Sequence, residues 1–146
     1  MITFDFMVPC EVVPDIQHKQ WLKSVIRKEG LVPGDISYLF CDDAYLLEQN
    51  IAFLHHDTFT DIITFDKRVG EIVSGDIMIS LERVAENAQK FSVSFEEEFL
   101  RVMVHGTLHL CGYKDKTDQE AAEMRRMENE SLAMFHEEYF YKLFKR

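Results

Sequence analysis

The residues best suited to bind a metal ion lie in segment 104–115, which reads VHGTLHLCGYKD. His105 and His109 are four positions apart, so on a helix their imidazoles share one face and can reach a single ion. Gly112 is expected to end that helix, and Asp115 follows beyond the turn, where it can supply a third ligand. Three protein ligands with an open fourth position are typical of a catalytic zinc site.

A metal ion held in this way would lower the pKa of a bound water toward about 7 and supply hydroxide at neutral pH. The spacing matches the three-ligand pattern of the metzincin peptidases, HExxHxxGxxH, with two changes. Gly106 stands where a peptidase has its general-base glutamate, and Asp115 stands where it has the third histidine. A metallopeptidase is therefore one interpretation, and the missing glutamate argues strongly against it.

Two histidines at this spacing can also be ordinary core residues bonded to carboxylates. The stretch around them is otherwise apolar, with Leu100, Val102, Met103, Val104, Leu108 and Leu110. Burying two imidazoles among such residues without partners would cost several kcal/mol. These surroundings, together with Gly112 and Asp115 in register, favour metal binding.

The elements that must position this segment alternate at first and then become purely helical. Strands are predicted over residues 2–8, 35–41, 61–66 and 71–79, with helices after the first two, from Asp15 toward Gly30 and over about 44–55. Three more helices are predicted over 81–91, 95–111 and 118–142, capped by Ser80, Ser94 and Thr117. The order β-α-β-α-β-β followed by helices predicts an α+β fold, a mixed four-stranded sheet packed with about five helices.

Length and composition limit the classes of protein that this chain can represent. The 146 residues, 47% of them apolar, fit one domain over residues 1–146, and 12 Phe, 5 Tyr and 1 Trp exclude a disordered acidic chain. No window approaches the ~18 uncharged apolar residues of a membrane span. The net charge of −10 argues against a simple electrostatic nucleic-acid binder, but not against RNA held by a few local contacts.

The cysteines point to a reducing compartment. Cys10, Cys41 and Cys111 are an odd number at irregular spacing, and the N-terminal residues lack the basic region of a signal peptide. We therefore expect reduced thiols and a cytoplasmic protein.

The metal-binding segment also resembles the signature HGxLHLxGYDH of the YbeY family, bacterial single-strand-specific endoribonucleases of ribosomal RNA maturation. The positions that match in place are His105, Gly106, Leu108, His109, Leu110, Gly112 and Tyr113. Further similar blocks follow in family order over about residues 45–130, at Asn50, 60–65 (TDIITF), 75–77 (GDI) and 123–128. The resemblance thus extends well beyond the histidines.

The resemblance implies a compact α+β fold with one zinc ion (Zn²⁺) per chain, held by His105, His109 and the residue at the third ligand position, Asp115. It implies a hydrolase, a metal-dependent endonuclease of rRNA processing and ribosome biogenesis in the cytoplasm, acting chiefly at the single-stranded 3′ region of small-subunit rRNA. The implied partners are the small ribosomal subunit and assembly factors, including small GTPases, with no membrane.

Two nucleophiles remain open for this implied reaction. A metal-bound water attacking the phosphodiester would leave 5′-phosphate products, whereas an activated ribose 2′-hydroxyl would leave a 2′,3′-cyclic phosphate. A ribosome-assembly binding factor, stabilised by zinc and with little catalysis, is the main alternative function.

Three positions depart from the family pattern. Asp115 replaces the third histidine, Leu54 stands where many members have an arginine thought to contact phosphate, and Asp61 replaces an asparagine. Because Asp115 adds a negative charge, it should make bound water less acidic. The departures at Leu54 and Asp115 favour the binding-factor alternative.

Substitutes for the missing groups must come from nearby residues. His55 or His56 could replace the arginine, although a solvated helix end is their more ordinary role. The candidates for the proton acceptor that Gly106 cannot be are Asp57, Asp61 and Asp76. We name His56, Asp61 and Asp76 as candidate catalytic residues. Basic residues that could border the site and meet RNA phosphates are Lys67, Arg68, Arg101, Lys114 and Lys116.

Overall fold

The computed structural model describes residues 1–55 and 60–140. The elements follow in the order β1 (Ile2–Phe6), α1 (Ile16–Lys28), β2 (Val32–Cys41), α2 (Asp43–Leu54), β3 (Ile62–Asp66), β4 (Ile72–Ser80), α3 (Leu81–Lys90), α4 (Phe95–Leu110), α5 (Asp118–Phe135) and the short π-helix η1 (His136–Phe140). This order confirms the prediction of four strands and five helices. The last predicted helix ends earlier than expected, because α5 stops at Phe135 and the chain continues as η1.

The sheet is mixed, as predicted, with strand order β1-β2-β4-β3. β1 and β4 both run parallel to β2, and β3 returns antiparallel to β4 as its hairpin partner. The two parallel pairs need crossovers, and α1 and α2 supply them. β4 therefore lies inside the sheet, between β2 and β3, where α4 packs on it.

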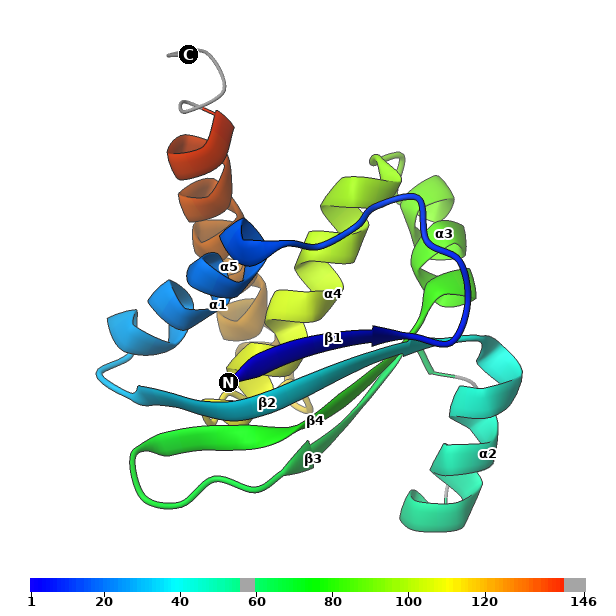
Figure 1. Ribbon diagram of the computed structural model, residues 1–146, viewed down its shortest axis with the longest axis horizontal. Coiled ribbons are helices and arrows are strands. Elements are labelled where there is room, and N and C mark those ends of the chain that lie inside the picture. The colour runs from blue at the N-terminus through cyan, green and yellow to red at the C-terminus, as the bar shows by residue number, and fades with distance from the viewer. Residues whose placement is uncertain (56–59, 141–146) are drawn as a thin grey trace.

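Helices cover the two faces of the sheet unequally. α1, α4 and α5 lie together over one face (Figure 1), and the main core forms beneath them around Trp21, Tyr38, Phe40 and Phe99. α2 packs on the opposite face, where Leu46 joins Cys41 and Ile63 in a separate small cluster. The larger core, rather than the cluster under α2, supports the segment with the two histidines.

Two close contacts fix α4 against the sheet. At Gly106, an added Cβ would lie 2.7 Å from Ile62 Cδ1 and 3.0 Å from Ile77 Cγ2, so this turn of the helix approaches β3 and β4 closely. The neighbouring Thr107 hydroxyl lies 2.6 Å from the hydroxyl of Tyr38 on β2, and both groups are buried. With these residues turned to the strands, His105 and His109 fall at the partly exposed border of the helix.

The predicted capping residues lie at the starts of their helices. Ser80, Ser94 and Thr117 each accept a hydrogen bond from the backbone N–H three residues later. Asp15 caps α1 as predicted, and His18 completes its capping box. Among the described residues, no helix combines the length and apolar character that crossing a membrane requires.

Candidate metal centre

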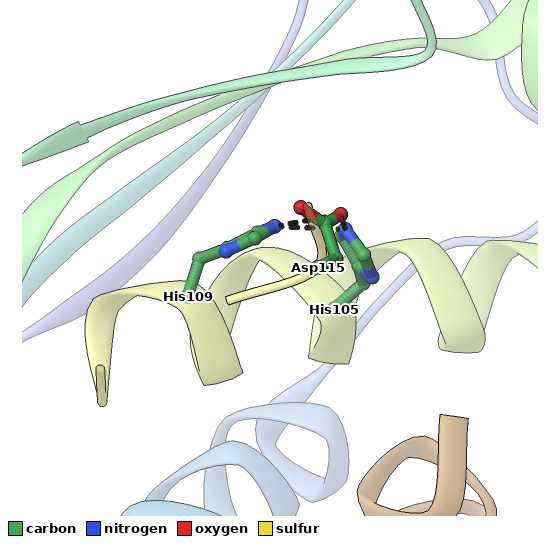
Figure 2. A group of neighbouring side chains, drawn as sticks. All are labelled: His105, His109 and Asp115. Carbon is green, nitrogen blue, oxygen red and sulfur yellow. Dashed lines mark hydrogen bonds and ion pairs between the residues drawn. The ribbon is translucent and has the colours of Figure 1, made fainter. Parts of the chain in front are cut away.

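The three predicted ligands meet at one point beside α4. Figure 2 shows the imidazoles of His105 and His109 rising from successive turns of the helix, with the carboxylate of Asp115 between them. The two Nε2 atoms are 3.0 Å apart, and Asp115 Oδ2 lies 3.3 Å from each of them. The structure thus brings together the group that spacing alone suggested.

The loop after α4 carries Asp115 back to the histidines. Gly112 has a φ of +110°, a conformation that few L-residues adopt, and it reverses the chain directly after the helix end. Two bonds from other elements hold this loop. Arg68 Nη1 donates to the Cys111 carbonyl at 3.0 Å, and the Tyr113 hydroxyl donates to Glu29 Oε2 at 3.0 Å.

Hydrogen bonds at the far side of each imidazole fix where its hydrogen lies. His109 Nδ1 is 2.9 Å from the Tyr113 carbonyl oxygen, and His105 Nδ1 is 2.6 Å from Glu128 Oε2. Because both oxygens accept, each Nδ1 is the donor and each Nε2 presents a lone pair. When both rings are neutral, two lone pairs and a carboxylate oxygen therefore face one another, an arrangement that suits a cation at its centre.

The spacing of the three atoms suits a small divalent ion. In a tetrahedral site with zinc-to-ligand bonds of about 2.0–2.1 Å, ligand atoms are about 3.3 Å apart. The observed separations of 3.0 and 3.3 Å agree with this geometry. Two imidazoles and one carboxylate suit zinc, and also Fe(II), Ni(II) or Co(II).

Two neighbouring groups at the site, His105 and Glu128, have shifted pKa values. Burial alone would lower the pKa of His105, but the hydrogen bond and charge of Glu128, with the charges of Asp115 and Asp61, raise it above its usual value. Burial would raise the pKa of Glu128, but His105 and Arg101 hold it below its usual value. One turn before Arg101, burial raises the pKa of the Glu98 carboxyl.

The three candidate catalytic residues have different outcomes. Asp61 directly precedes β3, and its charge contributes to the raised pKa of His105. Asp76 neighbours Ile77, which faces Gly106, and successive strand residues point to opposite faces of the sheet. Its carboxylate lies 2.6 Å from both Ser37 Oγ and Lys67 Nζ.

Asp76 is therefore turned away from the histidines, and the structure does not support its predicted role as proton acceptor. His56 lies outside the described residues, as does Asp57. His55 is the C-cap of α2, in the left-handed region with a φ of 57°, and its side chain is exposed.

Sequence reasoning missed the role of Glu128, whose partner His105 is 23 residues away. It placed Glu128 only within the block 123–128 that resembles the family, and it placed Arg101 only at the border of the site. A usable signal was present, since Glu128 shares helical spacing with the apolar Met124 and Leu132 and therefore occupies a buried face.

The structure also bears on the peptidase interpretation. The position of Gly106 faces Ile62 and Ile77 rather than the convergent ligands, and there is no room there for a longer side chain. A glutamate at this position would be buried against the sheet, so replacing Gly106 by glutamate would not create a general base at the ligands.

Comparison with known proteins places the chain among relatives that share its length. The family model described as Endoribonuclease YbeY matches residues 11–136. The Endoribonuclease YbeY of Flavobacterium psychrophilum is 51% identical over 136 residues, which cover 93% of this chain and 97% of that protein. That of Flavobacterium johnsoniae is 51% identical over 138 residues, covering 94% and 99%. A Thermotoga maritima protein with a known solution structure superposes with a TM-score of 0.67 at 27% identity, covering 97% of this chain and 93% of that one.

Proposed function

This chain belongs to the YbeY endoribonuclease family, and on that premise we propose that it is a metal-dependent enzyme that cleaves single-stranded RNA in the 3′-end maturation of rRNA. The observation that carries the metal dependence is the convergence of His105 Nε2, His109 Nε2 and Asp115 Oδ2. No other group of three or more His, Cys, Asp or Glu side chains within the described residues converges in this way.

In this proposal the two histidines hold the ion, and Asp115 also changes its charge. A bound divalent ion, with zinc as our candidate, would polarise a phosphoryl oxygen and activate the attacking water or hydroxyl. His105 and His109 hold such an ion from a helix packed in the core. Asp115 adds a negative charge where the family has a neutral imidazole, and so reduces the positive charge that the substrate meets.

Groups outside the ligand set complete the proposed reaction. Asp61, whose charge acts on His105, is the candidate proton acceptor, because Gly106 supplies no carboxylate and Asp76 faces away. Lys114 and Lys116 flank Asp115 and are exposed, and we assign them to RNA phosphates. The small ribosomal subunit with its assembly factors is the proposed partner, and the cytoplasm is the proposed location.

One observation favours a second candidate, a ribosome-assembly factor that binds zinc but cleaves little. Leu54, at the end of α2, is a partly exposed apolar residue at the position of the family's phosphate-contacting arginine. Loss of a cation that faces developing charge can reduce a rate by several orders of magnitude.

The deciding experiment compares cleavage of a labelled RNA with a single-stranded 3′ tail by wild type and His109→Ala, with metal content measured on the same preparations. His136→Ala, an exposed histidine beyond α5, is the matched control. Cleavage by wild type and the control, lost in a folded His109→Ala protein, supports the proposal, and the product ends identify the nucleophile. Equal background in all three, with metal bound by wild type, overturns it in favour of the assembly factor.

A further inference from the structure

Glu128 is a buried carboxylate that links two helices at the metal centre. It lies on α5 and is 5% exposed. Its Oε2 is 2.6 Å from His105 Nδ1, and its Oε1 is 3.0 Å from Arg101 Nη1, with both partners on α4. Each oxygen of this carboxylate therefore has its own partner.

The arginines that compensate the charge of Glu128 lie on one side of it only. Arg101 is itself largely buried, with 17% of its side chain exposed, and the more exposed Arg125 approaches the same oxygen at 3.5 Å. An isolated carboxylate would be costly at this depth, and the guanidinium offsets that cost. Because both arginines lie at Oε1, Oε2 is left to the imidazole.

This division of the two oxygens controls the orientation of His105. Nδ1 and Nε2 lie at different edges of the ring, so a ring anchored through Nδ1 directs its Nε2 lone pair at His109 Nε2 and Asp115 Oδ2. The oxygen that anchors the ring is on the far side from the convergent atoms. Glu128 is thus placed to support the ligand and not to bind the same ion.

The two histidines are supported in chemically different ways. His109 donates to a neutral backbone carbonyl, that of Tyr113, whereas His105 donates to a charged carboxylate. A carboxylate behind an imidazole makes that imidazole a better electron donor to a metal, besides fixing its tautomer. His105 should therefore be the stronger of the two nitrogen ligands.

We infer that Glu128, held in place by Arg101, is a positioning residue that fixes the metal-binding tautomer of His105 and raises the affinity of the site for its ion. This inference rests on the metal site of the proposed function. Its competitor is a salt bridge that only joins α4 to α5, which would affect stability alone.

The test uses full-length Glu128→Ala and Glu128→Gln proteins, with Glu130→Gln as the matched control. Glu130 is on the same helix and pairs with Arg126 and Lys28 at the surface. Histidine ¹⁵N spectra of the metal-free proteins, recorded at a pH at which His105 is neutral, report the tautomer of its ring. Competition with a chromophoric chelator gives the Zn²⁺ and Co²⁺ dissociation constants, and circular dichroism reports folding.

We expect the Glu128→Ala protein to bind both ions about 10–100-fold more weakly than wild type, and its His105 to lose the uniform Nδ1–H tautomer. The Glu128→Gln protein keeps an accepting oxygen but no charge, so its tautomer should persist while its affinity falls by less. If Glu128→Ala does not fold, the near-isosteric Glu128→Gln protein decides by its affinity. The Glu130→Gln protein should match wild type.

Two results would overturn the inference, and only one of them would also overturn the proposed metal dependence. Wild-type affinity in a folded Glu128 variant would reduce Glu128 to a structural salt bridge and leave the metal-dependent nuclease intact. Failure of wild type itself to bind either ion would overturn both this inference and the metal dependence in the proposed function.

Discussion

The candidate metal centre is built from two regions that are held in different ways. His105 and His109 lie on α4, whose neighbouring residues Gly106 and Thr107 are packed against the sheet. Asp115 lies on a loop, its side chain is 40% exposed, and the loop is held by bonds from Arg68 and Tyr113. Ligands on the helix are therefore fixed by the same contacts that stabilise the fold, whereas the loop ligand can change without unfolding the protein.

The largest effect is expected from a change on the packed side of α4. Gly106→Glu would force a carboxylate against Ile62 and Ile77, where an added Cβ is already within about 3 Å of both side chains. We expect a loss of unfolding free energy of roughly 3–5 kcal/mol, as for an uncompensated buried charge. Urea unfolding of the metal-free protein measures it. Stability equal to wild type would show that α4 is held less tightly than its contacts indicate.

The next effect tests the loop ligand. Asp115→Ala should weaken metal binding by about 100-fold, equivalent to about 2.7 kcal/mol, while the metal-free protein unfolds as wild type does. Asp115→His, which restores the family's ligand type, should retain the ion. Chelator competition and thermal unfolding provide the two readouts. If the metal-free Asp115→Ala protein lost as much stability as a core variant does, the loop ligand would be as important for folding as the helix, contrary to our expectation.

A smaller effect is expected where the loop is tethered to α1. Tyr113→Phe removes the bond to Glu29 Oε2 and should cost about 1 kcal/mol of stability, with a few-fold loss of metal affinity as Asp115 becomes less restrained. A double-mutant cycle with Glu29→Ala isolates the pair. Additive losses in the double mutant would mean that this bond contributes nothing to holding the loop.

The smallest effect concerns pH. The Glu128 carboxylate behind His105 titrates, whereas the Tyr113 backbone carbonyl behind His109 does not. The lowered pKa of Glu128 makes its contribution to stability complete above its unfolded value of about 4.3, and falling pH removes it. The raised pKa of His105 makes its contribution complete below its unfolded value of about 6.5, and rising pH removes it.

In the metal-free protein, the stability difference between wild type and Glu128→Gln should therefore be largest near about pH 5–6 and shrink on either side. Urea unfolding in the presence of a chelator measures this difference across the pH range. A difference that stays constant from about pH 4 to 8 would mean that the pair does not titrate as a unit.

Local signals predicted most of the fold. The capping residues Asp15, Ser80, Ser94 and Thr117 placed the helix starts, and the alternation of strands and helices gave the mixed sheet. β2 begins earlier than expected, at Val32, because Val32 and Pro33 pair with β4 ahead of a register shift, although proline usually ends a strand. Tertiary pairing decided this boundary.

For the candidate site too, local patterns predicted some residues and tertiary packing determined others. The ligands within one helix and its following turn were predictable from their spacing. For Glu128 the local pattern shows only a buried face, because its pairing with His105 depends on how α5 packs against α4. The strand pattern itself indicates that Asp76 faces away from the histidines. Its neighbours Ile77 and Ile79 are core residues, and the two-residue period of a strand assigns only one of the two positions 76 and 77 to a given face.

The placement of Glu128 has a consequence for the order in which the site is made during translation. Glu128 is added 13 residues after Asp115, the last of the three ligands, which at 5–20 residues per second corresponds to about one to three seconds. A nascent chain that has already exposed both histidines and Asp115 still lacks the carboxylate on α5. Capture of an ion in that interval relies on the three ligands alone, and full retention begins only once the following helix has emerged and docked.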